Sequence, residues 1–339
     1  MEIKQKDSFL KSRSRQVRLA IPSKGRMEIE TQEFLRNCGF NIQRNNRQYI
    51  GSIQGPVNLQ LVYQRQVDIV RGVLNGSIEM GIVGYDLVLE HLSGNENELV
   101  IIHDKLNFGK CSLEIAIPEE WSEKSIDEIK QKSKIIRVAT KFPKLTKQFL
   151  NSFHISHELI KANGSLEVYP ELGQSDIIVD LVSTGQTLKD NRLKMVKGGQ
   201  ILTSEAVLIG NRTALKNDTV LTITRELIEY IEATLRAQNF VSVFVNMRGE
   251  SSEAIVKAMF LKEGLEGLQG PTISTVFTRN GEKMYAVHII VEKERLQDAI
   301  RNLRAIGGSG VVVAPTLYIF EEEPLRYIKL LKNLGIYDD

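Results

Sequence analysis

The chain has 339 residues, of which 42% are hydrophobic and 25% charged, and 44 basic against 42 acidic residues leave a net charge of +2. This length exceeds the usual size of a single hydrophobic core, so two or three domains are expected. The balanced charge gives no general reason to expect nucleic-acid binding, and no apolar run approaches the roughly 18–20 residues needed to cross a membrane.

Neither the N-terminus nor the cysteines suggest an exported protein. The first residues lack the continuous apolar segment of a signal peptide, which predicts a cytoplasmic location. Cys38 and Cys111 lie far apart and outside any CxxC pattern. They therefore predict neither a disulfide framework nor a zinc site.

The first part of the chain alternates strands and helices joined by short loops. A β-type run at Val17–Ile21 opens into the basic turn Pro22–Arg26. The elements expected next are a helix at Met27–Cys38, a strand at Leu59–Tyr63, a helix at Asp68–Leu74 and a strand at Met80–Val83. This alternation predicts an α/β fold with parallel strands.

A weak internal repeat suggests two similar lobes. Gly76–Val83 and Gly173–Asp180 both run from a glycine through an acid into an apolar strand that ends at a polar turn. Between these copies, a strand at Cys111–Pro118 and a strand–helix unit at Ile135–Phe153 are expected. Two α/β lobes with a cleft between them explain the repeat; chance is the alternative, because a glycine before a buried strand is common.

The pattern changes after Gly210, which predicts a domain boundary near residues 211–218. An amphipathic helix at Glu226–Ala237 is followed by a βαββαβ series, the ferredoxin-like arrangement. Asn280-Gly281 marks the hairpin between its two middle strands. The segment after Phe320 predicts a short closing helix.

The segment that follows the strand at Asp176–Asp180 has the composition of a phosphate-binding loop. Gly185 permits a backbone conformation that exposes successive N–H groups, and the neighbouring hydroxyls add donors without bulk. Asp180, at the strand end, is an acceptor suited to the hydroxyls of a ribose. The loop residues are Ser183, Thr184, Gly185, Gln186 and Thr187, which we call the phosphate loop. A hydroxyl-rich turn with no ligand is the alternative interpretation.

The basic turn Pro22–Arg26 is the second candidate. Lys24 and Arg26, beside Gly25, have the charge and geometry to hold a pyrophosphate. An exposed basic turn is the alternative. Two such loops, one on each lobe, favour a phosphate-handling function more than either does alone.

Several ordered segments resemble the ATP phosphoribosyltransferase family. They span most of Val17–Gly210 and are VRLAIPSKGR, RQVDIVRGVLNGSIEMGIVGYD, LNFGKCSLEIA, RVATKFPKLTKQFL, NGSLEV and DLVSTGQTL. The resemblance implies that N1 of ATP is joined to C1 of 5-phosphoribosyl 1-diphosphate (PRPP), with release of pyrophosphate in the presence of Mg²⁺. It also implies a two-lobed core like that of periplasmic binding proteins. The βαββαβ tail resembles the regulatory domain of the family's long form, typically a homo-hexamer inhibited by histidine.

The resemblance assigns domains and site residues. Lobe I comprises 1–110 and 195–224, lobe II comprises 111–194, and the regulatory domain comprises 225–339. The implied PRPP contacts are Asp180, Ser183, Thr184, Gly185, Gln186, Thr187, Lys24 and Arg26; the ATP contacts are Arg65, Gly84, Tyr85 and Asp86; the histidine contacts are Pro271, Thr272 and Ser274. Asp180 and Glu167 are the implied catalytic acids. Glu167 and Asp176 both match family acids near the site, and a structural role is the alternative for each.

Two departures concern these assignments. Leu181 follows Asp180, whereas many other phosphoribosyltransferases carry two adjacent acids, so one carboxylate remains for the ribose. Ser23 lies within a basic turn that is often shorter in the family, which affects the roles of Lys24 and Arg26.

The expected chemistry needs no general base, because adenine N1 loses no proton when it attacks. Orientation of two substrates and stabilisation of charge at C1 and on the departing pyrophosphate suffice. Mg²⁺ is expected to be held mainly through substrate phosphates, with direct protein ligands unassigned.

Two rival functions remain. A non-catalytic two-lobed solute receptor shares the lobes but not the paired phosphate-type loops. A transcription regulator needs a helix-turn-helix, for which residues 1–14 are too short.

Overall fold

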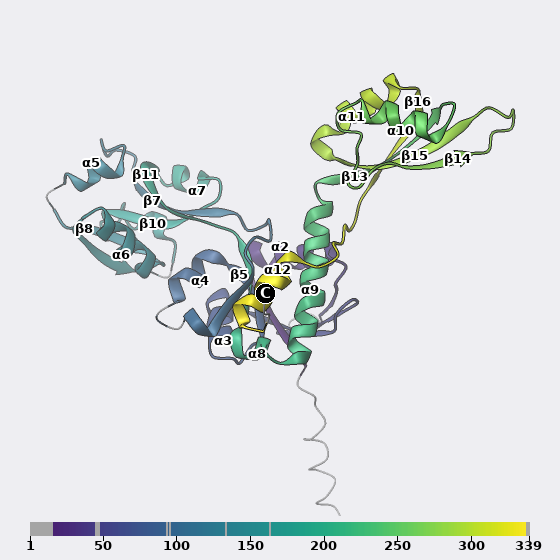
Figure 1. Cartoon of the computed structure of the whole chain (residues 1–339). Coiled ribbons are helices and arrows are strands. Elements are labelled where there is room, and N and C mark those ends of the chain that lie inside the picture. Colours follow the sequence, from purple (N-terminus) through teal and green to yellow (C-terminus); the bar gives the residue numbers. More distant parts are fainter. Residues whose placement is uncertain are drawn as a thin grey trace, which may run out of the picture. The chain divides into compact units, whose positions relative to one another are not determined.

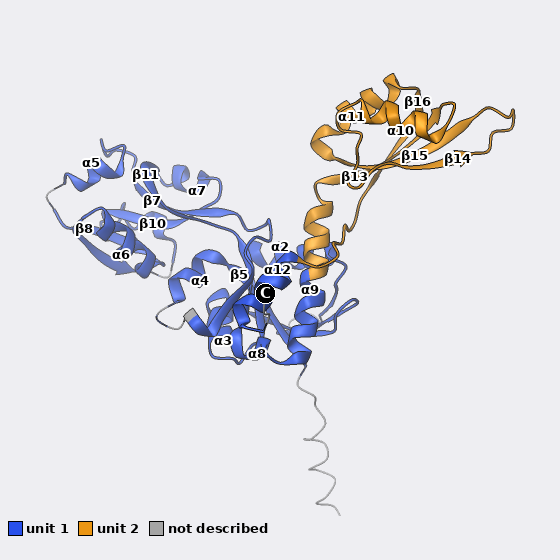
Figure 2. Ribbon diagram, in the orientation of Figure 1, with its two compact units in different colours: residues 1–228, 325–339 blue, residues 229–324 orange. Residues whose placement is uncertain are grey.

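The computed structural model describes residues 16–44, 48–92, 94, 96–132, 134–162 and 164–336. These residues fall into two compact units, divided at Ile228/Glu229 and again at Pro324/Leu325 (Figure 2). The first unit contains two sheets and the second contains one. None of the described helices is long and apolar enough to cross a membrane.

The first sheet of unit 1, with the helices around it, forms lobe I (Figure 1). Its seven strands have the order β2-β3-β4-β1-β5-β12-β6. They are β1 (Arg18–Pro22), β2 (Asn41–Gln43), β3 (Ile50–Gln54), β4 (Leu59–Gln64), β5 (Met80–Gly84), β6 (Leu99–His103) and β12 (Ala206–Asn211). The helices are α2 (Arg26–Asn37), α3 (Gln66–Leu74), α4 (Tyr85–His91), η1 (Glu96–Glu98), α8 (Arg212–Leu215) and the first part of α9 (Asp218–Ala237).

The second sheet of unit 1 forms lobe II, with five strands in the order β11-β7-β10-β8-β9. They are β7 (Cys111–Pro118), β8 (Ile136–Thr140), β9 (His157–Lys161), β10 (Ile177–Val182) and β11 (Leu193–Ser204). The helices are α5 (Ile126–Lys130), α6 (Pro143–Ser152), η2 (Leu166–Val168) and α7 (Gln186–Asp190). Lobe II has its own cores, one on each face of the sheet.

Unit 2 is the βαββαβ domain expected from the sequence. Its four antiparallel strands have the order β14-β15-β13-β16, and the alternate residues Val241, Val243, Val245 and Met247 of β13 pack against helices α10 and α11. The elements are β13 (Phe240–Arg248), α10 (Ser252–Phe260), β14 (Thr272–Val276), β15 (Met284–Glu292), η3 (Lys293–Arg295), α11 (Leu296–Ala305) and β16 (Gly308–Pro315). The expected fold class, a two-lobed α/β core followed by this domain, is confirmed.

The two halves of the internal repeat occupy interior positions of the two sheets. Gly76 and Gly173 have φ of 71° and 68°, a left-handed conformation that glycine adopts without strain. The strands that follow, β5 and β10, are flanked on both sides by other strands. Each ends at a turn that leads into a helix, α4 or α7.

Several sequence expectations need correction. The sheets are mixed rather than wholly parallel: β1 pairs with β4 and β5 in parallel, but β12 and β7 run antiparallel to their partners. The β2–β3 pair was not expected.

Residues 195–204, expected in lobe I, belong to lobe II because β11 pairs with β7. The closing helix α12 (Leu325–Leu334), expected in the regulatory domain, belongs to unit 1, where Leu330 and Leu334 are buried.

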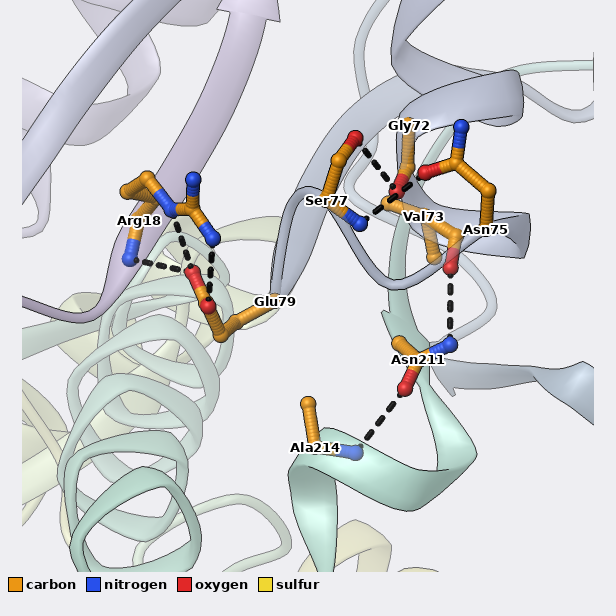
Figure 3. A network of polar contacts seen from close by, with 8 residues as sticks. All are labelled: Arg18, Gly72, Val73, Asn75, Ser77, Glu79, Asn211 and Ala214. Atoms are coloured by element: carbon orange, nitrogen blue, oxygen red, sulfur yellow. Dashed lines mark hydrogen bonds and ion pairs between the residues drawn. The ribbon is translucent and has the colours of Figure 1, made fainter. Parts of the chain in front are cut away.

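A polar network fixes lobe I at the N-terminal ends of β1 and β5 (Figure 3). Arg18 donates three hydrogen bonds of 2.8–2.9 Å to the carboxylate of Glu79. Burial alone would raise the pKa of Glu79, but these bonds and the charge of Arg18 lower it below its usual value. Asn211 donates to Val73 O and accepts from Ala214 N, each at 2.9 Å, which ties β12 to α3 and α8. The network is structural and leaves the opposite ends of the strands for the site.

Candidate active site

A cavity of about 770 Å³ lies between the two lobes. Ligands of open α/β sheets bind beyond the carboxyl ends of strands, and this cavity lies where β5 and β10 end. Lobe I contributes Tyr85, and the crossing segment between β6 and β7 contributes Lys105, Asn107 and Lys110. Lobe II contributes Ser183 and Gln200. The lysines and Asn107 were not among the site residues predicted from the sequence, although LNFGK contains two of them.

The phosphate loop begins where β10 ends. Gly185 has φ 75° and ψ 2°, the left-handed conformation that turns the chain from strand to helix α7. The Thr184 hydroxyl accepts a 3.4 Å hydrogen bond from Gln186 N. The side chains of Ser183, Thr184, Gln186 and Thr187 are exposed. The loop therefore presents hydroxyl groups to solvent, as an anion site requires.

Asp180 precedes this loop and is largely buried. Its carboxylate accepts a 2.9 Å hydrogen bond from Leu181 N and lies 3.7 Å from Lys141 Nζ. Burial raises the pKa of Asp180; the ammonium of Lys141 opposes that rise, and the nearby charge of Glu167 adds to it. The charge of Glu167 thus acts on Asp180, and the structure adds Lys141, whose role sequence reasoning missed.

A further acid faces Asp180 from the neighbouring strand. Glu114 of β7 is paired in register with Asp180, and residues directly opposite in an antiparallel pair share one sheet face. Glu114 is 7% exposed. Its signal in the sequence is a single charge inside the apolar run Cys111–Pro118. Asp176, by contrast, lies at the other end of β10 and binds Arg137 and Lys134, which favours its structural interpretation.

The basic turn contacts the phosphate loop beside the cavity. Arg26 donates one hydrogen bond of 3.3 Å to Ser183 Oγ and one of 3.4 Å to Lys110 O, and its guanidinium pairs with Glu30 at 3.1 Å. Gly25 has φ 75°, and Lys24 is exposed. The two candidate phosphate loops, 157 residues apart in sequence, are therefore neighbours in space.

The turn at the end of β5 is the candidate nucleotide contact. Gly84 N donates to Gln66 Oε1 at 3.0 Å, Tyr85 lines the cavity, and Arg65 is exposed just before α3. Asp86 is different. It is 3% exposed, and its carboxylate accepts a 2.5 Å hydrogen bond from Ser204 Oγ.

Burial raises the pKa of Asp86, while the Ser204 hydrogen bond opposes the rise. Asp86 N in turn donates to Ser204 Oγ at 3.0 Å, so this acid ties α4 to the end of β11. Its side chain is turned inward onto Ser204, which favours a structural role, and the predicted contact of Asp86 with the nucleotide stays a prediction.

The candidate histidine stretch lies on β14 of unit 2. Thr272 and Ser274 are exposed and Pro271 is half-buried. Thr272 lines a cavity of about 360 Å³ together with Arg236, Gly270 and His288. Pro271 and Ser274 do not line it. The Nε2 atom of His288 is buried and has no hydrogen-bond partner.

The described residues include no group of three or more His, Cys, Asp or Glu side chains able to hold a metal ion. Mg²⁺ is commonly bound through one or two carboxylates and substrate phosphates. Asp180, just before the phosphate loop, and Glu167, whose charge acts on Asp180, have the carboxylates for that mode.

The fold and this site define a two-lobed α/β protein with a cavity between its lobes. The ATP phosphoribosyltransferase family profile matches residues 65–236, and the HisG C-terminal domain profile matches residues 237–316. The chain belongs to the ATP phosphoribosyltransferase family. It is a phosphoribosyl-transferring enzyme, and the family catalyses the first step of histidine biosynthesis from ATP and PRPP.

Individual relatives agree. The chain is 42% identical over 337 residues to ATP phosphoribosyltransferase 1, chloroplastic, of Arabidopsis thaliana, covering 95% of this chain and 82% of that protein. It is 32% identical over 297 residues to ATP phosphoribosyltransferase of Methanococcus maripaludis, covering 88% and 97%. In structure it is similar to the ATP phosphoribosyl transferase (HisG:HisZ) complex from Thermotoga maritima. That match has a TM-score of 0.51 and 25% identity, and covers 64% of this chain and 98% of that one.

Proposed function

We propose that this enzyme transfers the 5-phosphoribosyl group of PRPP to N1 of ATP. A bond forms between adenine N1 and ribose C1, and the bond from C1 to the pyrophosphate oxygen breaks, so the electron pair leaves with pyrophosphate. The observation that carries the proposal is the hydrogen bond between Arg26 and Ser183, which joins the basic turn to the phosphate loop at a residue that lines the cavity. A ligand with phosphates at both ends of a ribose fits this arrangement.

The proposed roles follow the geometry. The phosphate loop Ser183–Thr187 holds the 5-phosphate, Asp180 accepts hydrogen bonds from the ribose hydroxyls, and Lys24 with Arg26 holds the pyrophosphate. On the nucleotide side, Arg65 and the Gly84-Tyr85 turn hold ATP. Lys105 and Lys110 supply further positive charge for phosphates in the cavity.

Asp180 and Glu167 are the proposed catalytic acids. Asp180 is proposed to lie beside the ribose and the charge of Glu167 acts on it, so that negative charge stabilises cationic character developing at C1. Neither needs to remove a proton. Mg²⁺, held by substrate phosphates with help from these two carboxylates, would supply positive charge to the departing pyrophosphate.

Unit 2 is proposed to bind histidine as a feedback inhibitor through Pro271, Thr272 and Ser274. The cavity that Thr272 and His288 line supports an amino-acid-sized ligand there. We also propose a homo-hexamer, which multi-angle light scattering would measure, and a cytoplasmic location, which imaging of the tagged full-length protein would test.

A single assay tests the central proposal. Purified protein is incubated with ATP, PRPP and Mg²⁺, and phosphoribosyl-ATP and pyrophosphate are measured. Equal amounts of both products are expected, with none when ATP is omitted. Pyrophosphate released without ATP would indicate hydrolysis of PRPP instead. Binding of both ligands without turnover would favour the non-catalytic receptor.

A further inference from the structure

Helix α6 of lobe II begins without a cap of its own. Its N-cap residue, Phe142, makes no side-chain hydrogen bond, and its first turn contains no acid. The first N–H groups of a helix have no partner within the helix and must be satisfied from outside. Here the partner is Glu90 on α4 of lobe I: its two carboxylate oxygens accept from Lys144 N at 2.9 Å and Leu145 N at 3.0 Å.

The reverse contact completes the pair. Lys144 Nζ donates to Leu89 O at 3.0 Å and to Leu92 O, carbonyls at the C-terminal end of α4. A carboxylate at a helix N-terminus and an ammonium at a helix C-terminus both complement the helix dipole. We call the contacts made by Glu90 and Lys144 the interlobe clasp.

The Glu90 side of the clasp is buried, its contacts with Lys144 are partly buried, and apolar contacts lie beside it. Glu90 is only 8% exposed, and Leu87 and Leu89 of α4 pack against the core of lobe II. Hydrogen bonds to a charged group contribute more when water is excluded. The clasp therefore resists a change in the angle between the lobes.

The two helices that the clasp joins, α4 and α6, begin next to site residues of lobe I and lobe II respectively. Helix α4 begins at Tyr85, which lines the cavity, and α6 begins two residues after Lys141, the ion-pair partner of Asp180. We propose that Glu90 and Lys144 are positioning residues, which set the approach of the nucleotide turn to the ribose carboxylate. This role rests on the proposed transfer reaction, because it matters only where ligands on both lobes must react.

The expected defect is in catalysis and not in nucleotide binding. Glu90→Ala leaves two buried N–H groups unpaired and Lys144→Met removes the ammonium while leaving the Glu90 cap. Each is expected to lower kcat on the order of ten- to a hundred-fold, because a small misplacement of the reacting groups has an effect of that size. The Kd of ATP alone should stay within about twofold, because its proposed contacts lie on lobe I. Glu90→Gln keeps one carbonyl acceptor and should restore part of the lost kcat.

A matched control separates positioning from stability. Ser125 caps α5 by accepting from Glu128 N at 3.3 Å, within lobe II and away from the other lobe. Ser125→Ala should lower the melting temperature with kcat nearly unchanged. Hydrogen exchange of the first turn of α6 should accelerate in Glu90→Ala and not in Ser125→Ala.

Three results decide the matter. If Glu90→Ala and Lys144→Met keep wild-type kcat, or lose no more than Ser125→Ala, the positioning role is overturned. Should Glu90→Ala not fold, Lys144→Met and Glu90→Gln give the same test. If wild-type protein itself has no turnover, the proposed transfer reaction is wrong. If wild-type protein turns over but hydrogen exchange in the first turn of α6 is the same in Glu90→Ala as in wild type, only the clasp proposal is wrong.

Discussion

Acid should destabilise unit 1 through one buried histidine, His103. This residue of β6 is 1% exposed. Its Nδ1 accepts a 3.3 Å hydrogen bond from Lys105 N, and its Nε2 is buried without a partner. Burial, aided by the charge of Arg326 and opposed by Asp104, lowers its pKa from 6.5 to about 3. The folded protein therefore holds this imidazole neutral.

The sign of the effect follows from the two states. The unfolded chain protonates His103 below about pH 6.5, whereas the folded chain does not until about pH 3, so the unfolded state binds the extra proton between these values. The free energy of unfolding therefore suffers no loss from His103 above pH 6.5, and it falls as the pH is lowered below that value. Each pH unit within the window costs about 1.4 kcal/mol, so going from pH 7 to pH 5 should cost about 2 kcal/mol from His103.

The measurement is urea unfolding at pH 7 and pH 5, followed by the single tryptophan, Trp121, which lies in unit 1. His103→Asn retains an acceptor for Lys105 N but cannot gain the proton. It should be less stable than wild type at pH 7 and lose about 2 kcal/mol less on acidification. His154→Asn, at an exposed position with φ 58° that asparagine tolerates, should keep the wild-type pH dependence. Equal pH dependence in His103→Asn and wild type would refute the reasoning.

Three further outcomes are expected. Asp180→Asn and Thr187→Val should each lower kcat/KM for PRPP roughly ten- to hundred-fold with the Kd of ATP unchanged; equal loss for both substrates would point to misfolding. Arg18→Met leaves Glu79 without its main partner and should destabilise unit 1 by about 2–3 kcal/mol in urea unfolding, with kcat per folded molecule intact; a neutral result would mean water replaces the arginine. Thr272→Val should weaken histidine inhibition by ~5–150-fold with uninhibited turnover preserved, and an enzyme that ignores histidine altogether contradicts the sensor role.

The sequence predicts best those features that depend on neighbours in the chain. The left-handed turn at Gly185 and the hydroxyls around it follow from local composition, and the structure has them as expected. The βαββαβ series of unit 2 was also predictable from the sequence, because segments with the apolar spacing of strands alternate there with segments that have the spacing of helices. The hairpin position at Asn280-Gly281 also follows from local turn chemistry, and Gly281 has φ 75°.

Features that depend on distant side chains were not predictable. Lys141 reads as an ordinary surface lysine until folding places it 3.7 Å from Asp180. Asp86 looks like a free acid at a strand end, and only the position of Ser204, 118 residues later, turns it inward. The uncapped start of α6 is visible in the sequence, but nothing in the sequence shows that its partner is Glu90, 54 residues earlier.

The same limit applies to strand pairing. Residues 195–204 follow a lobe II helix and precede a lobe I strand, so composition cannot decide their sheet. Pairing of Thr203 and Ser204 with Ser112 and Cys111 decides it. Helix α12 is likewise assigned by what its apolar side covers, and its Arg326 pairs with Asp104 of lobe I at 2.9 Å.

Because the chain leaves unit 1 at Ile228 and re-enters it at Leu325, unit 2 is an insertion and not an appendage. A stop codon placed before unit 2 would therefore also delete α12 and uncover the apolar surface of β6 that it shields. A variant that removes unit 2 but keeps α12 must join residue 228 to residue 325 through a linker. A protease that cuts once within 316–324 would give a nicked protein, in which unit 2 stays attached through α9. Helix α12 would then be held to unit 1 by non-covalent contacts alone, among them Arg326–Asp104 and the hydrogen bonds between Arg212 and Asn333.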